Sequence, residues 1–335
     1  MKKKRWTAAV LVSVLLFMVL FYTAGWLLMP PRQDYGSTWS SFRQEPKQSI
    51  DVMFFGSSLA YCNIVPAVIW KDTGITSYLM AGPEQTIPFT YSYVKEACRT
   101  QTPKVVAIEI TGMFYRQYCD YSKVNAGYMP WTKNRLEATF SAAEPELRAG
   151  LLFPLLDYHS RWREVSLSDL KLRLAPSADP YAGYTFLTEA EPQSEVICRD
   201  YSAETENYQR NLQYLHKIHD FCREREIQLM LFLTPTKGPI PADAQAVLEQ
   251  DIAALQDAVF VDFNAHMDAL QIDDRTDWFD FLHFNCQGAE KFSQHLAQYL
   301  RDVLELGQTE REDEILWQSR VDSFDSRRTD AVSSQ

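Results

Sequence analysis

The stretch that most constrains the fold is residues 50–59, which read Ile-Asp-Val-Met-Phe-Phe-Gly-Ser-Ser-Leu. An apolar run of strand length ends at Gly56, Ser57 and Ser58, and sequence compatible with a helix follows. Open α/β sheets bind ligands at the carboxyl ends of their strands, which is where this strand would place the two serines. A serine in the first turn of the next helix exposes its hydroxyl beside unpaired N–H groups, which suits a nucleophile. Gly-Ser-Ser more often closes an ordinary turn and caps a helix, so this stretch alone does not establish a function.

A second motif, near the other end of the chain, supplies the groups that a serine nucleophile needs. Asp280 lies three residues before His283, within Trp-Phe-Asp-Phe-Leu-His-Phe-Asn at 278–285. A serine hydroxyl is a weak nucleophile until a base removes its proton, and histidine is such a base near neutral pH. A carboxylate then holds the histidine tautomer and stabilises the imidazolium. The alternative is that Asp280 caps a short turn and His283 packs against its aromatic neighbours. His159, beside Asp157, ranks well below His283 as the base.

Together the two motifs resemble those of the SGNH (GDSL-like) hydrolase superfamily. Residues 56–59 are similar to its first block, with Ser57 in place of the usual aspartate and Ser58 at the nucleophile position. The Asp-x-x-His formed by Asp280 and His283 is similar to its last block. The resemblance therefore implies a Ser58-His283-Asp280 catalytic triad.

The resemblance also implies an oxyanion hole. Gly82 follows a second predicted strand and resembles the second-block glycine, whose N–H serves the oxyanion hole together with the N–H of Ser58. The third block, normally Gly-x-Asn-Asp, has no counterpart, because the chain reads Thr-Gly-Met at 111–113. Thr111 is the weakest of the three candidate donors.

Among members of the superfamily, the chain most resembles the membrane-anchored ones, including the D-alanyl transfer protein of teichoic acid modification and the alginate O-acetylation proteins. This implies a serine esterase or O-acyltransferase acting on acetyl or D-alanyl esters of cell-envelope glycans or polymers. It implies no metal and no organic cofactor, and it suggests a membrane acyl-export protein as a partner. The alternative is a non-catalytic binding or assembly module of an envelope acylation system, which the missing third-block asparagine favours.

The N-terminus predicts a membrane anchor at residues 1–29. Residues 6–29 carry no charge and exceed the ~20 apolar residues that span a bilayer. The four basic residues at 2–5 predict a cytoplasmic N-terminus and an extracytoplasmic catalytic domain, in a single-pass protein of the cell membrane. A long cleavable signal peptide is the alternative.

From residue 50 onward, apolar strands alternate with amphipathic helices. This pattern predicts a parallel sheet covered on both faces, in the flavodoxin-like three-layer α/β/α sandwich that the superfamily uses, over residues 50–304. The predicted strands are 50–55, 76–80, 104–110, 227–233 and 258–263, and the predicted helices are near 65–71, 85–100, 205–226, 242–256 and 288–304.

Three segments fall outside this alternation. Residues 30–49 predict a linker that holds the domain off the membrane. Residues 113–202 form an insertion rich in Tyr, Trp, Arg and Pro, whose side chains suit stacking on sugars or binding anionic polymers, or else pack the insertion's own small core. Residues 305–335 predict a polar, disordered tail.

Charge and cysteine content restrict the partners. A net charge of −11, with no basic cluster beyond the N-terminus, argues against nucleic acid. No two of the six cysteines have C-x-x-C spacing, so zinc is not expected. An exported domain permits disulfides. Cys119 with Cys198 is one candidate pair, Cys62 and Cys286 are expected near each other at the active site, and the pairing stays open.

Overall fold

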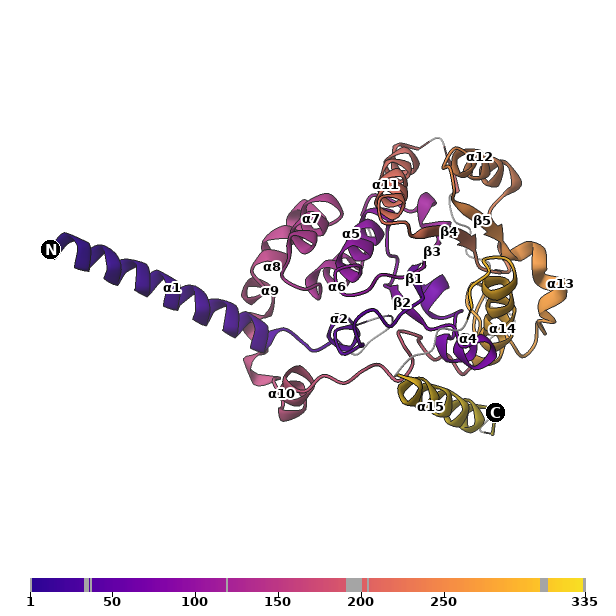
Figure 1. Cartoon of the computed structure of the whole chain (residues 1–335). Coiled ribbons are helices and arrows are strands. Elements are labelled where there is room, and N and C mark those ends of the chain that lie inside the picture. Colours follow the sequence, from indigo (N-terminus) through magenta and orange to yellow (C-terminus); the bar gives the residue numbers. More distant parts are fainter. Residues whose placement is uncertain are drawn as a thin grey trace.

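A single five-stranded parallel sheet organises the part of the chain that the computed structural model describes. The strands are β1 (Val52–Gly56), β2 (Ser77–Ala81), β3 (Val105–Glu109), β4 (Gln228–Leu233) and β5 (Val259–Asp262), in the order β2-β1-β3-β4-β5 (Figure 1). The five predicted strands are therefore confirmed, and the order is that of a flavodoxin-like doubly wound sheet. The described residues are 2–32, 36, 38–118, 120–190, 201–203, 205–307 and 313–333.

Both faces of the sheet are buried, which explains why the strands read as continuous apolar runs. Along β1, Met53 and Phe55 point into one core, whereas Val52 and Phe54 point into the other. The helices that cover the first face are α5 (Ile87–Ala97), α11 (Glu206–Arg223) and α12 (Ala242–Ala253), and those on the second are α4 (Pro66–Thr73) and α14 (Cys286–Asp302). The predicted α/β/α layering is therefore confirmed.

The sheet order fixes where a site can form. β1 has β2 on one side and β3 on the other, so the direction of winding reverses between β1 and β3. Crossover connections leave on opposite faces at such a point, and open α/β sheets bind their ligands beyond the carboxyl ends of the strands there. The residues that follow β1 lie at this position.

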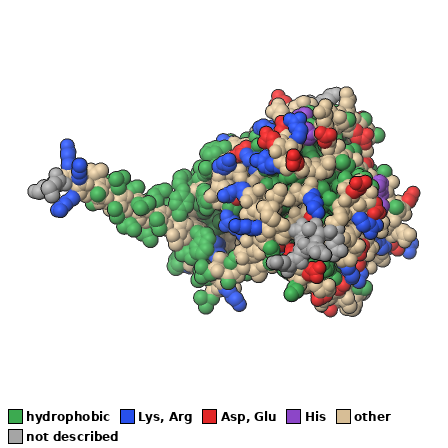
Figure 2. Space-filling view, viewed as in Figure 1, with side chains coloured by type: hydrophobic (Ala, Val, Ile, Leu, Met, Phe, Trp, Pro, Cys, Tyr) green, Lys and Arg blue, Asp and Glu red, His purple; other side chains and the backbone are tan. Residues whose placement is uncertain are grey.

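An N-terminal helix, α1 (Lys2–Leu28), projects from the domain (Figure 1). Its 27 residues extend about 40 Å at 1.5 Å per residue. Residues 3–28 are long and apolar enough to cross a membrane, and most of this surface is exposed, as the hydrophobic side chains along it show in Figure 2. These features support a membrane anchor.

The segment predicted as a linker contributes side chains to the core of the domain. Within it, α2 (Trp39–Phe42) buries Trp39 and Phe42 in the first core, and the Trp39 ring packs edge-on against Tyr93 at 4.9 Å between centroids. Burying two large aromatic side chains is more favourable in free energy than leaving them exposed to solvent in a flexible linker. The linker is thus part of the folded domain from Trp39 onward.

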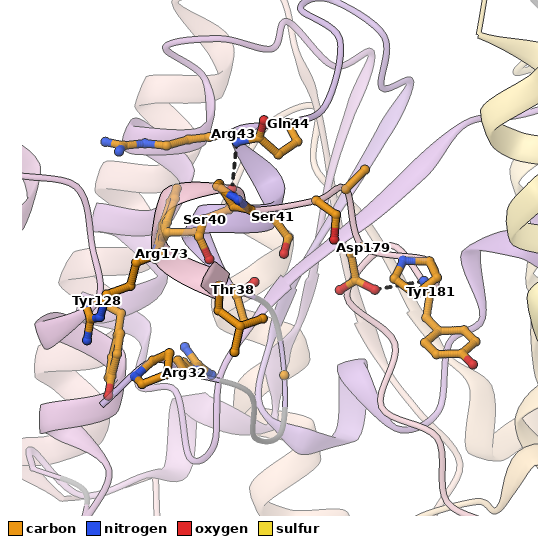
Figure 3. A pocket seen from close by; sticks show the side chains of 18 of the residues that line it. Arg32, Thr38, Ser40, Ser41, Arg43, Gln44, Tyr128, Arg173, Asp179 and Tyr181 are labelled. Atoms are coloured by element: carbon orange, nitrogen blue, oxygen red, sulfur yellow. Dashed lines mark hydrogen bonds between the residues drawn. The ribbon is translucent and has the colours of Figure 1, made fainter. Parts of the chain in front are cut away.

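The insertion folds, over its described residues, into a series of short helices. Arg135 is buried, donates to the carbonyls of Met129 and Leu151 at 2.8 Å each, and packs its guanidinium over Trp131. This part of the insertion is therefore stabilised by contacts among its own residues. The last of the short helices borders a cavity beside α1 (Figure 3). The elements are η1 (Ile110–Phe114), α6 (Ser122–Gly127), α7 (Lys133–Ser141), η2 (Pro145–Leu147), α8 (Arg148–Leu152), α9 (Leu155–Tyr158), η3 (His159–Arg163) and α10 (Leu167–Leu174).

The disordered tail predicted from residue 305 is wrong where the chain forms α15 (Glu314–Ser333). Trp317, Val321 and Phe324 recur at helical spacing and are buried against α4 and its neighbours. Trp317 stacks on Trp70 of α4 with ring centroids 6.3 Å apart. This narrow apolar stripe, hidden in a charged composition, gives the helix a face to bury.

A buried ion pair joins α15 to the linker. Arg320 and Glu45 are both nearly inaccessible to solvent, and the Arg320 guanidinium donates to the Glu45 carboxylate and to the carbonyl of Asp179. Burial raises the pKa of Glu45, and the charge of Arg320 offsets part of that shift. Loss of either partner would leave an unpaired buried charge, so the two segments are held together.

If α15 is part of the core, Phe324→Ala should lower the free energy of unfolding by about 3–5 kcal/mol, because it leaves a cavity beside Tyr184 and Phe186. Denaturant unfolding of the purified full chain measures this. The matched control is Ser326→Ala, at an exposed position of the same helix, which should change the value by less than ~0.5 kcal/mol. Equal stability of the two variants would mean that this segment is a solvated tail and not part of the core.

Candidate active site

β1 ends in a turn that requires glycine and delivers Ser58 to the start of a helix. Gly56 has φ of +141°, and a Cβ at this position would lie 2.8 Å from the Cβ of Glu109 on β3. The chain can therefore turn sharply between two closely spaced strands. Helix α3 (Ser58–Tyr61) follows, with Ser58 partly exposed at its start.

The two serines after the turn have different environments. Ser57 is buried and caps α3, where its Oγ accepts the N–H of Leu59 at 3.4 Å and the hydroxyl of Tyr115 at 3.1 Å. Ser58 is the first residue of the helix, and its N–H has no acceptor among the described residues. Such an N–H at a helix start is available to a ligand.

His283 connects Ser58 to Asp280. Its Nε2 lies 2.7 Å from Ser58 Oγ, although the two residues are 225 positions apart in the sequence. Its Nδ1 lies 2.8 Å from Oδ2 and 3.0 Å from Oδ1 of Asp280. Because an ionised carboxylate only accepts, Nδ1 carries the hydrogen and Nε2 is left to accept from the serine hydroxyl. The expected contact between Ser58 and His283 is present, in the orientation that a general base needs.

Asp280 is held as a carboxylate by its surroundings. Burial would raise its pKa, but hydrogen bonds from His283 and from the backbone N–H groups of Leu282 and His283, at 2.7 and 2.8 Å, outweigh it and lower the pKa below the ordinary value. Asp280 is therefore charged at neutral pH, facing the imidazole.

The loop that carries both residues is a tight antiparallel turn. Trp278 and Phe284 form an antiparallel bridge, are fully buried, and have ring centroids 4.3 Å apart. The N–H of Phe279 donates to the carbonyl of His283 at 2.9 Å. The aromatic residues around the Asp-x-x-His motif thus anchor the loop, while Asp280 and His283 stay partly exposed.

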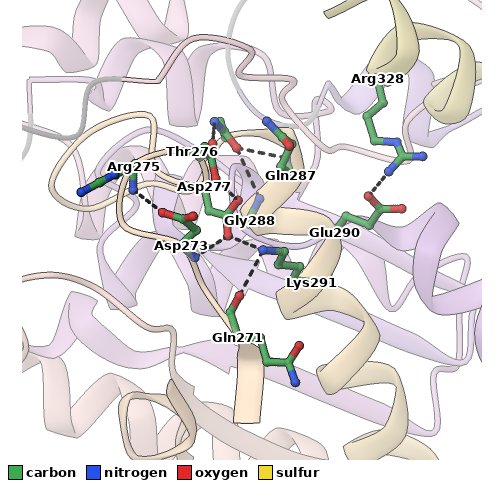
Figure 4. Close-up of polar contacts among 11 residues, drawn as sticks. Gln271, Asp273, Arg275, Thr276, Asp277, Gln287, Gly288, Glu290, Lys291 and Arg328 are labelled. Atoms are coloured by element: carbon green, nitrogen blue, oxygen red, sulfur yellow. Dashed lines mark hydrogen bonds and ion pairs between the residues drawn. The ribbon is translucent and has the colours of Figure 1, made fainter. Parts of the chain in front are cut away.

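A buried carboxylate fixes the base of this loop (Figure 4). Asp277 is 1% exposed, pairs with Lys291 Nζ of α14 at 2.6 Å, and accepts the N–H of Asp273 at 2.7 Å. Its carbonyl accepts the N–H of Asn285, the residue that caps α14. The loop is therefore tied to the helix that follows it.

Asn63 is a residue of the site that no sequence motif indicated. It is fully buried in the turn after α3, and its Oδ1 accepts the N–H of Phe284 at 2.9 Å while its Nδ2 contacts the carbonyl of Leu282 at 3.5 Å. It thereby connects the segment that carries Ser58 to the loop that carries His283. The sequence gives no sign of this role beyond the position of Asn63 five residues after Ser58.

Two predicted oxyanion donors are used elsewhere. The N–H of Gly82 donates to the carbonyl of Gly56 at 3.2 Å and so extends the pairing of β1 with β2. Both the N–H and the hydroxyl of Thr111 donate to the Glu109 carboxylate. Neither residue therefore offers a free N–H or O–H in this structure, whereas the N–H of Ser58 has no acceptor among the described residues, and the oxyanion donors stay a prediction.

Other candidate residues lie away from the site or outside the description. His159 is exposed on η3, with Nδ1 3.1 Å from the carbonyl of Leu156. Cys119 and Cys198 lie outside the described residues, so the structure does not bear on their pairing. The cysteines present as free thiols are Cys62, Cys98, Cys222 and Cys286.

Comparison with known proteins yields only distant similarity. One family model, which carries no description, matches residues 159–305, and no curated protein sequence matches the chain. Fifteen chains of solved structures match. One, from Bacteroides fragilis NCTC 9343 and provisionally described as an acylhydrolase, has 11% identity and a TM-score of 0.38 over 80% of this chain and 99% of that one. Another, an acetyl xylan esterase from the rumen bacterium Butyrivibrio proteoclasticus, has 9% identity and a TM-score of 0.35 over 78% and 66%. At these values neither similarity bears on the activity of this chain.

Replacing Asn63 by Ala should lower the free energy of unfolding by about 1–3 kcal/mol, because the N–H of Phe284 would remain buried without its acceptor. Denaturant unfolding of the full chain measures the loss. Gln298→Ala, at an exposed position of α14, is the control and should be neutral within ~0.5 kcal/mol. Equal stability of both variants would mean that the Asp277 contacts hold the loop without Asn63.

Proposed function

We propose that this chain is a membrane-anchored serine esterase or O-acyltransferase. The observation that carries the proposal is the hydrogen-bonded series from Asp280 through His283 to Ser58 Oγ, with each contact between 2.7 and 3.0 Å. In this arrangement the serine hydroxyl is activated by a base whose tautomer is fixed by a carboxylate.

The reaction would proceed through a covalent acyl-enzyme. Ser58 Oγ attacks the ester carbonyl while His283 Nε2 accepts its proton, and Asp280 stabilises the imidazolium that forms. The tetrahedral oxyanion is bound by the N–H of Ser58. His283 then gives the proton to the departing alcohol oxygen, which leaves acyl-Ser58. Water or a sugar hydroxyl then attacks the acyl carbon while His283 accepts its proton, and His283 returns that proton to Ser58 Oγ as the bond between the acyl group and the serine breaks.

The proposed substrate class is acetyl or D-alanyl esters of cell-envelope glycans or polymers, with the domain outside the cytoplasm. The short connection from the anchor to α3 supports a substrate near the membrane. The N–H of Gly36 donates to Oγ1 of Thr185, and the N–H of Thr185 donates to the carbonyl of Tyr61 in α3. Gly36 is eight positions after Leu28, and eight residue steps extend at most ~29 Å. The nucleophile helix is therefore kept within a short reach of the bilayer.

The alternative proposal, a non-catalytic binding or assembly module, is favoured by one observation. Gly82 and Thr111 engage their donors within the fold, so the oxyanion hole relies on the N–H of Ser58. One oxyanion donor lowers the activation free energy by about 2.7–4 kcal/mol, so a site with fewer donors is a slower catalyst. The two experiments below separate the alternatives.

Fluorophosphonate labelling of the full chain should disappear in Ser58→Ala and persist in Ser57→Ala. Ser57 is buried as a helix cap, so its loss should cost only ~0.5–2 kcal/mol of stability. Gel fluorescence after labelling provides the measurement. The reverse pattern would contradict the assignment of the nucleophile, and a wild-type chain that is never labelled would support the binding module.

Asp280→Asn should lower turnover of a chromogenic acetyl ester by up to ~10⁴-fold, a magnitude known from the serine protease triad. The amide removes the charge that stabilises the imidazolium and no longer selects the required tautomer. Because the pKa of Asp280 is lowered, the wild-type residue is charged throughout a neutral assay. The matched control is Asp274→Asn, at an exposed position of the preceding loop, which should retain wild-type turnover. Equal rates for both variants would exclude Asp280 from the reaction.

A further inference from the structure

A cavity where α1 enters the domain is lined by residues other than the catalytic candidates Ser58, Asp280 and His283. Its volume is about 860 Å³. The end of α1, the linker, α10, residues 176–186 and α15 all contribute to its wall, as Figure 3 shows in part. The residues that set its chemistry are Trp26, Arg32, Arg43, Arg173, Asp179 and Arg327.

Arg173 has buried donors without a partner in this cavity. Its Nε and Nη2 are inaccessible to solvent and donate to no acceptor among the described residues. Its guanidinium carbon lies 5.2 Å from the ring of Trp26 on α1. An unsatisfied buried charged donor costs more than the ~1–3 kcal/mol of a neutral one, so such a group in a native protein calls for a bound ion or water.

The remaining charges of the wall point to an anion. Arg32, Arg43 and Arg327 also line the cavity, and Asp179 is the only carboxylate among the described lining residues. Asp179 is already engaged, since it accepts the N–H groups of Tyr181 and Gly183. Arginine forks match the geometry of phosphate oxygens, so the wall is complementary to a phosphate-bearing ligand.

The position of the cavity along α1 identifies the source of that phosphate. Phe21 packs against Phe153 and Tyr22 against Trp131, with ring centroids 6.1 and 5.7 Å apart. A bilayer core accommodates about 20 residues of a helix, so a core that starts at Trp6 ends near residue 25, about one helical turn beyond these two contacts. Trp26, which borders the cavity, therefore lies at the membrane interface, where aromatic side chains meet lipid headgroups.

The surface around this level is suited to lipid. Large apolar side chains of η3 and α10 are exposed there, and hydrophobic side chains gather at the base of α1 in Figure 2. They include Trp162, Leu167 and Leu174, which are 63%, 86% and 73% exposed. Water-exposed side chains of this size are costly, whereas a bilayer interface would cover them.

We propose that the cavity binds the phosphate of an anionic membrane lipid headgroup, with Arg173 as the principal contact and Trp26 beside it. The headgroup would enter from the bilayer around α1 and satisfy the buried donors of Arg173. This inference depends on α1 lying in a membrane, and it is independent of the esterase activity.

Native mass spectrometry of the full chain in detergent, titrated with phosphatidylglycerol, tests the proposal. One lipid should bind per wild-type chain, and Arg173→Gln should weaken that binding at least ~10-fold. The matched control is Arg163→Gln, because Arg163 also stacks on a tryptophan, Trp162 at 4.5 Å, but does not line the cavity. It should bind as wild type does. Arg327→Gln, at the residue that α15 contributes to the cavity wall, should also weaken binding and serves if Arg173→Gln does not fold.

Three outcomes would overturn the proposal. Equal weakening by Arg163→Gln and Arg173→Gln would mean that the lipid binds by general surface charge. Equal binding of phosphatidylcholine would remove the selectivity for an anionic headgroup. Displacement of phosphatidylglycerol by an equal concentration of inorganic phosphate would identify a site for free phosphate. None of these measurements uses Ser58, so a failure here leaves the proposed esterase untouched.

Discussion

The site depends on the close approach of β1 and β3 at Gly56. Because the Glu109 side chain fills the space where a Cβ would stand, the chain can leave β1 only through a glycine turn, and Ser58 is brought directly to a helix start. The same approach has a second effect. Glu109 also receives both donors of Thr111, so the contact that positions the nucleophile removes a polar group from its surroundings. Nucleophile placement and oxyanion stabilisation are therefore coupled through one carboxylate.

What the sequence could predict follows from the range of the interactions involved. Strands buried on both faces leave continuous apolar runs, so the sequence predicts all five. Asp280 and His283 can be paired from the sequence because they are three residues apart. The acceptor of the Gly82 N–H depends on strand register, which composition does not record. The role of Asn63 arises from a contact 221 positions away, and a lone asparagine gives no local sign of it. The stripe of α15 was missed because charged residues surround it.

Two arginines of the insertion illustrate how one residue type serves different purposes. Arg135 and Arg173 both pack against tryptophans, at 3.8 and 5.2 Å from the ring. Arg135 donates to two backbone carbonyls and thereby braces the turns around it. Arg173 faces a cavity with no such carbonyl among the described residues. Whether an arginine stabilises the fold or is available to a ligand thus depends on the acceptors within its reach. The content of aromatic residues and arginines in the insertion does not distinguish these two roles.

The pairing of Arg320 with Glu45 has a consequence for the order of events during biogenesis. The two partners are separated by 275 positions, with the entire sheet between them, so α15 packs on a segment that is made before any strand. A nascent chain that emerges N-terminus first therefore carries an unpaired Glu45 until Arg320 has also been made. A chain interrupted before Arg320 would keep that carboxylate unpaired and would expose to quality-control proteases the surface that α15 covers.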